Sequence, residues 1–182
     1  NATSRTWSQA RLSQARYAPV AATVNTKMFF AGGLDEHLSA VVDIFDVETL
    51  QWTTANLSTP RGWLAAAASN SVVVFAGGQG MEAVSDVVDI YDVAQSSWRT
   101  ASLSVARLDL AATSWGSQIF IGGGRYWVGQ AYESTDALDV FDTQANTWSS
   151  VQLPVARHGL AAAAAVGKFI FAGGRVQDLE PM

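Results

Sequence analysis

The chain contains no cysteine among its 182 residues. This absence excludes disulfide bonds, a thiol nucleophile and a cysteine-ligated zinc site, although it does not indicate a compartment. Histidine is almost as scarce, because only His37 and His158 occur, and they stand apart in the sequence. Neither belongs to a metal-type cluster, so we expect no metal site and no cofactor.

Positive charge is also scarce. The chain has two lysines, no basic run and a formal net charge of −5 at pH 7. Because nucleic-acid binding depends on clustered Lys and Arg, we expect no nucleic-acid partner. Charged residues make up 15% of the chain and hydrophobic residues 49%, a balance that predicts a buried core rather than disorder.

Residues 62–81 contain no charge over twenty positions, which raises the possibility of a membrane span. The middle of this run is "SNS", and the corresponding positions elsewhere carry Lys27 and Lys168. The run therefore predicts two buried strands and no membrane span. No signal peptide is visible and the first residue is not Met, so we expect a processed chain or a portion of a longer one. Sequons at Asn1 and Asn56 are weak evidence for secretion, and the localisation, cytoplasmic or extracellular, stays open.

What the chain does contain is an internal repeat. Three unrelated markers, a Trp, an Arg and a Gly-Gly pair, each recur with the same irregular steps of 45, 46 and 50 residues. The markers are Trp7, Trp52, Trp98 and Trp148; Arg16, Arg61, Arg107 and Arg157; and the pairs Gly32-Gly33, Gly77-Gly78, Gly123-Gly124 and Gly173-Gly174. All length variation lies between Gly-Gly and a following Asp (Asp43, Asp89, Asp139), so a constant frame carries one variable loop per repeat.

Each repeat predicts four short strands, a to d. In the second repeat, strand a is "GWLAAAAS", strand b is "VVVFAGG", strand c is "VVDIYDV", and strand d begins at Trp98. The alanines 161–165 have high helix propensity, but only about eight residues separate Arg157 from the next turn, too few for a typical helix of about eleven. We therefore expect a strand there as well.

An apolar strand ending in Gly-Gly, followed by "VDIYD" and then by Trp, resembles the kelch repeat, with Asp where that family often has Glu. The resemblance implies an all-β fold, a kelch-type β-propeller in which each repeat forms one four-stranded antiparallel blade. The glycines permit close approach of neighbouring backbone, and each Trp has the area to fill the wedge between blades. A phosphate-binding loop at Gly-Gly is disfavoured, because a strand and not a helix follows.

The repeat boundaries predict three full blades and two partial ones. Residues 1–15 should supply the last strand of a preceding blade, residues 16–60, 61–106 and 107–156 the three full blades, and residues 157–182 the first two strands of a further blade. We expect a portion of a larger propeller; a small ring of about four blades and closure by a second copy are the alternatives.

Alternating strand directions place the d–a loops, the four arginines and the variable b–c loops on one face. The longest variable loop, Arg125 to Ala137, carries Arg125, Tyr126, Trp127 and Tyr132. Tyr and Trp are enriched at binding hot spots, so these residues are candidates for partner recognition. Capping of the blade is the equally open alternative.

Arg16, Arg61, Arg107 and Arg157 are expected around the central opening, with His158 at its border. The resemblance to kelch substrate adaptors implies that such arginines grip acidic peptides. The alternative is that each pairs with a local Asp or a loop carbonyl, since residues that recur in every repeat usually serve the frame. The recurring aspartates favour hydrogen bonding at strand ends over acid–base chemistry, and we assign no catalytic residue.

The leading functional expectation is a binding module that presents this face to a protein or peptide, an acidic one being a candidate. A sugar-binding or sialic acid mutarotase-like propeller and a purely architectural role are the alternatives, and a non-enzymatic role is favoured. A copper oxidase related to galactose oxidase does not fit, because these residues include no Cys and only two His. Further blades or another chain are expected to be needed for closing the ring.

Overall fold

The computed structural model describes residues 7–176, and its regular elements are all strands. The first blade consists of β1 (Val20–Val24), β2 (Lys27–Ala31), β3 (Val41–Asp46) and β4 (Gln51–Asn56). The second consists of β5 (Ala65–Ser69), β6 (Val72–Ala76), β7 (Val87–Asp92) and β8 (Ser97–Ser102). The third consists of β9 (Ala111–Trp115), β10 (Gln118–Gly122), β13 (Ala137–Asp142) and β14 (Thr147–Gln152).

In these three sheets the strands pair antiparallel in chain order, and two shorter pairs complete the fold. The third blade carries an inserted hairpin of β11 (Arg125–Val128) and β12 (Ala131–Ser134). The last sheet has only β15 (His158–Ala165) and β16 (Lys168–Arg175). The alanines 161–165 lie within β15, so the expected strand is present, because pairing with β16 outweighs their helix propensity.

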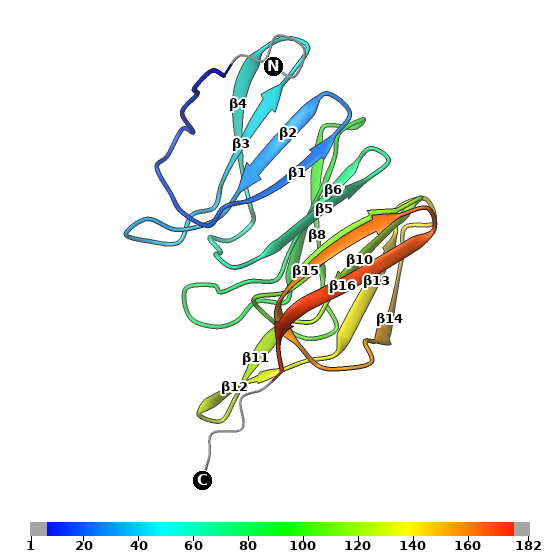
Figure 1. The fold of residues 1–182 in the computed structure, drawn as a ribbon. Helices are drawn as coiled ribbons and strands as arrows, with labels where there is room; N and C mark the ends of the chain where they lie inside the picture. The colour runs from blue at the N-terminus through cyan, green and yellow to red at the C-terminus, as the bar shows by residue number, and fades with distance from the viewer. Residues whose placement is uncertain (1–6, 177–182) are drawn as a thin grey trace.

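The sheets stand side by side like propeller blades, as Figure 1 shows. Each first strand packs beside the first strand of the next blade: β1 contacts β5, β5 contacts β9, and β9 contacts β15. Small side chains along these strands, such as Ala65 and Ala67, allow this close approach. The all-β blade architecture expected from the sequence is confirmed, and the sheets do not close into a ring within the described residues.

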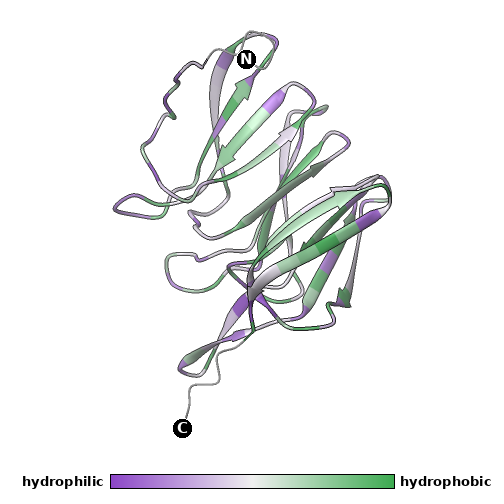
Figure 2. Cartoon of the chain, in the orientation of Figure 1, coloured by the Kyte–Doolittle hydropathy of each residue, from purple (hydrophilic) through white to green (hydrophobic). Residues whose placement is uncertain are grey.

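The hydrophobic core lies between the blades. Strand β6 is buried along its whole length, and its alternating side chains serve two neighbours. Val73 and Phe75 face the cluster shared with the first blade, whereas Val72, Val74 and Ala76 face the cluster shared with the third. Figure 2 shows the corresponding hydrophobic colouring of the inner strands. Each blade is therefore stabilised mainly by its neighbours.

The tryptophans of the repeat behave differently according to whether a preceding blade covers them. Trp98 packs on Tyr91 with ring centroids 4.8 Å apart and joins the cluster between the first two blades. Trp148 packs on Phe141 at 4.7 Å and joins the cluster between the second and third. Trp52, in the first blade, is exposed. The wedge between blades is thus filled where two blades meet.

Trp7 lies before the first blade, and its side chain is 97% exposed because no preceding blade among the described residues covers it. Residues 7–15, the described part of the segment expected to end a preceding blade, form no strand. In each of the three four-stranded sheets the last strand pairs with the third strand. Residues 7–15 have no such partner in the described chain, which explains why the repeated sequence alone does not produce a strand there.

The Gly-Gly pairs mark the joints between blades. Gly77 has a φ of +63°, and a Cβ added to it would lie 2.5 Å from the carbonyl oxygen of Arg107 in the next blade. The adjacent amide of Gly78 donates to that same carbonyl at 2.8 Å. Glycine is therefore required at this point by backbone conformation and by the approach of the next blade together.

Candidate functional site

The arginine at the start of each blade is held inside that blade. In the second blade, the Arg61 guanidinium forms an ion pair with Asp89 of β7. It also donates to the carbonyl oxygens of Gly77 at 2.7 Å and Val87 at 2.6 Å. The Arg61 side chain is fully buried. This cation consequently holds strand ends together and presents no surface to a partner.

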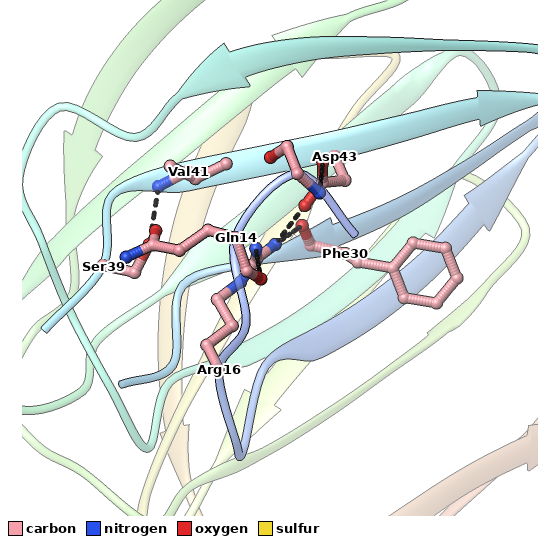
Figure 3. Close-up of polar contacts among 7 residues, drawn as sticks. Gln14, Arg16, Phe30, Ser39, Val41 and Asp43 are labelled. Carbon is pink, nitrogen blue, oxygen red and sulfur yellow. Dashed lines mark hydrogen bonds and ion pairs between the residues drawn. The ribbon is translucent and has the colours of Figure 1, made fainter. Parts of the chain in front are cut away.

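The same arrangement recurs in the neighbouring blades. Arg16 pairs with Asp43 at 2.7 Å, and Arg107 pairs with Asp139 at 2.9 Å, both with buried side chains. Figure 3 shows the Arg16 guanidinium between the Asp43 carboxylate and the carbonyl oxygen of Phe30, which accepts a hydrogen bond at 2.9 Å.

The Asp43 carboxylate also accepts a hydrogen bond from the Ser13 amide at 3.0 Å. Burial alone would raise the pKa of Asp43, but the hydrogen bonds from Ser13 and Arg16 and the charge of Arg16 together lower it. For Arg61 and Arg107, burial lowers the guanidinium pKa, and the paired aspartates oppose that change. The charged form is therefore favoured for the Asp43 carboxylate, whereas burial outweighs the paired aspartate at Arg61 and Arg107 and their pKa stays lowered.

These contacts distinguish between the two interpretations of the arginines. The side chains of Arg16, Arg61 and Arg107 are buried in ion pairs within the blades and are not exposed for contact with a partner. The alternative, pairing with a local Asp and loop carbonyls, describes their geometry. Arg157 donates to the Gly173 carbonyl at 2.8 Å and is partly exposed, because the described part of its blade has no third strand to supply an Asp.

The residue two positions after each arginine has a backbone conformation that the sequence analysis missed. Ala18, Trp63, Asp109 and Gly159 all have positive φ, between 51° and 64°. The Asp109 amide donates to the Trp63 carbonyl at 3.1 Å, and the Gly159 amide donates to the Asp109 carbonyl at 2.8 Å. These hydrogen bonds link consecutive blades where their first strands begin. The constant spacing of two positions from each Arg could have identified these four residues in the sequence as an equivalent set.

The long variable loop forms a hairpin, β11–β12, anchored to its surroundings. Trp127 and Tyr132 pair across the hairpin, with ring centroids 4.8 Å apart in an edge-to-face arrangement. The Arg125 guanidinium lies 4.5 Å from the Tyr132 ring centroid, while its Nε donates to Asp109 at 2.7 Å. The Tyr132 hydroxyl donates to Gln79 at 3.4 Å. The hairpin is therefore attached to Asp109 of its own blade and to Gln79 of the preceding blade.

The other predicted residues of this region lie close by. The Tyr126 hydroxyl donates to Glu133 at 3.3 Å; burial and the negative charge of Glu133 both raise the pKa of this phenol. The His158 Nδ1 lies 2.9 Å from the Ser134 hydroxyl. Tyr126 and His158 are thus engaged with neighbouring polar groups, whereas Trp127 is 54% exposed.

Two hollows separate the variable loops. The first hollow, of 350 Å³, lies between residues 32–40 and 77–86, and Glu36, Trp63 and Met81 are among its lining residues. The second hollow, of 260 Å³, lies between residues 77–86 and the hairpin, and its lining includes Glu82, Trp127 and Tyr132. Gln79 lines both hollows, so they adjoin. Trp63 and Met81 were not singled out from the sequence, because neither belongs to a repeated marker.

Neither a metal centre nor a membrane helix is found in the part of the chain that the structure describes. No three His, Asp or Glu side chains among these residues are grouped so that they could hold a metal ion. None of the same residues forms a helix long and apolar enough to cross a membrane.

Comparison with known families adds the decisive observation. The model for the KLHDC2/KLHL20/DRC7 Kelch-repeats domain matches residues 20–180 of this chain. The chain belongs to the kelch-repeat family. A comparison with curated proteins gave no match. The resemblance inferred from the Trp, Arg and Gly-Gly markers is confirmed, and the kelch fold makes this chain a propeller module of the protein-interaction type.

Proposed function

We propose that this kelch module binds a protein or peptide partner on its loop face, which we define as residues 32–40, 77–86 and 123–136 together with Trp63. The surface available there is hollowed and carries exposed large apolar side chains. Met81 is 75% exposed, Trp127 54% and Trp63 39%, and all three line the two hollows. Exposed large apolar side chains gathered around hollows are typical of interaction sites.

Trp63 is the single observation that carries the proposal. Its φ of +51° belongs to a region that bulky residues rarely occupy, and the equivalent positions hold Ala18, Asp109 and Gly159. All four equivalent positions share this φ, so the conformation belongs to the frame of the repeat. What distinguishes Trp63 is a large indole at that position, which stays 39% exposed and lines the first hollow. An exposed aromatic ring beside a hollow supports recognition of a partner.

The opposite face offers a partner much less loop surface. Its a–b turns are two residues long, as between β1 and β2, and its c–d turns are short. The alternative of simple capping accounts for Tyr132, which contacts Gln79, but not for the exposed ring of Trp127. No observation on the described residues supports the carbohydrate-binding or architectural alternatives.

The proposal can be tested by site-specific photo-crosslinking in cells that make the full-length protein. A photoreactive phenylalanine derivative replaces Met81 or Trp127 on the loop face, and Leu50 on the opposite face as the matched control. Leu50 is 69% exposed and lies in the turn between β3 and β4. We expect positions 81 and 127 to crosslink the same partner and position 50 not to. Crosslinking of a partner from position 50 alone would contradict the proposal.

A further inference from the structure

The charge of the loop face indicates the chemistry of its partner. Its three loops contain six carboxylates and a single cationic residue, Arg125. The carboxylates are Asp35, Glu36, Glu82, Asp86, Glu133 and Asp136. The Arg125 Nε donates to Asp109, and its guanidinium covers Tyr132. The positive charge expected here from Arg16, Arg61 and Arg107 is buried and neutralised within the blades.

The two hollows repeat one combination of side chains. The first places the exposed carboxylate of Glu36 with the indole of Trp63, and the second places Glu82 with the indole of Trp127. No Lys or Arg lines either hollow, and the first also includes His37. Both hollows therefore combine negative charge with an exposed aromatic ring.

This combination fits the side chain of lysine or arginine. A carboxylate forms an ion pair with the cationic group, and the face of an indole attracts the same cation. The apolar stem of Lys or Arg packs on hydrophobic neighbours, which here are Leu34 and Met81 in the first hollow and Val84 in the second. An acidic peptide would instead meet an excess of carboxylates.

We propose that the loop face binds a basic peptide segment, with one Lys or Arg side chain in each hollow and the peptide backbone crossing over Gln79. This inference rests on the proposed function, because it assigns a partner chemistry to the same surface. It replaces the acidic peptide that the resemblance to kelch substrate adaptors implies.

The test is selection of a random twelve-residue peptide display library on the full-length protein, followed by fluorescence anisotropy with the enriched peptides. We expect the enriched peptides to contain at least two Lys or Arg with apolar neighbours. E36Q and E82Q should each weaken binding by roughly two- to fivefold, the range for an exposed ion pair, and the double variant by roughly the product of the two. Higher salt should weaken binding by the wild-type protein more than binding by the double variant.

The controls separate this inference from the proposed function. Glu48→Gln, an exposed carboxylate in the turn between β3 and β4, should leave the affinity unchanged. Trp127→Ala should weaken binding roughly tenfold or more, as loss of a hot-spot aromatic does. Acidic or neutral enriched peptides that lose affinity with Trp127→Ala but not with E36Q or E82Q would overturn the basic-peptide inference and leave the binding surface in place. Peptides insensitive to Trp127→Ala and to Trp63→Ala would overturn both.

Discussion

The recurring arginine connects its own blade to the preceding one. The Arg61 backbone amide donates to the Ser39 carbonyl of the preceding blade, whereas its side chain pairs with Asp89 and the strand-end carbonyls of its own blade. An apolar residue could fill the same volume but would remove the hydrogen bond to the Gly77 carbonyl and the ion pair with Asp89. Because buried unpaired polar groups are costly, the position requires a long side chain with several donors.

Removing the negative partner of this arginine should destabilise the fold strongly. We expect Asp89→Asn to lower the free energy of unfolding by about 3–5 kcal/mol, because it leaves the buried Arg61 charge uncompensated. Urea unfolding followed by tryptophan fluorescence measures the change. Asp35→Asn, at an exposed loop position, is the matched control and should shift the unfolding free energy by less than about 0.5 kcal/mol. Equal effects of the two substitutions would contradict a structural role for the pair.

At the scale of single residues, the sequence could predict which residues recur but not which contacts their side chains make. The constant spacing of Arg61 and Asp89 is compatible with a binding ring and with an internal ion pair alike. The side chains come together only because β5 and β7 are placed around β6 in one sheet. The same limitation hid Trp63, whose importance depends on backbone conformation and on the loops beside it.

Strands and turns were the most predictable elements. Alternating apolar residues and two-residue turns predicted strands a to d in each repeat, because the side-chain period of a strand is two. The hairpin β11–β12 was expected only as a loop, since its four-residue strands are too short for a clear alternation. For residues 7–15 the sequence predicted a strand that the structure does not show. Trp7 matches the repeat, but the described chain has no third strand with which these residues could pair.

The turn between β15 and β16 contains a residue poorly suited to its conformation. Val166 has a φ of +46° and is 86% exposed, whereas the equivalent residues Asn25 and Asn70 have φ near 52°. Left-handed backbone costs β-branched residues more than Asn, and no packing is lost at an exposed position. We therefore expect Val166→Asn to stabilise the chain by about 1 kcal/mol. The reciprocal Asn25→Val should destabilise it by a similar amount in urea unfolding, and a gain from both would contradict this explanation.

At the scale of the whole molecule, consecutive blades are joined through Gly-Gly. A Cβ added to Gly123 would lie 2.6 Å from the Arg157 carbonyl oxygen and 2.8 Å from a methyl group of Leu160, both in the next blade. Gly173 occupies the equivalent place in the last sheet, yet a Cβ there would meet nothing within 4 Å among the described residues. The two glycines therefore differ in whether a neighbouring blade covers them, while their φ values of +64° and +73° are alike.

The difference in unfolding free energy between Gly123→Ala and Gly173→Ala measures how much packing of the next blade contributes to the need for glycine. Both substitutions carry the cost of Ala in left-handed backbone, about 1–2 kcal/mol, which cancels in the difference. In the 182-residue chain, Gly123→Ala should lower the free energy of unfolding by about 2 kcal/mol more, because its Cβ separates two packed blades. If a further blade covers Gly173 in the full-length protein, Gly173→Ala should there become as destabilising as Gly123→Ala. An equal effect already in the short chain would show that blade packing does not determine the need for glycine.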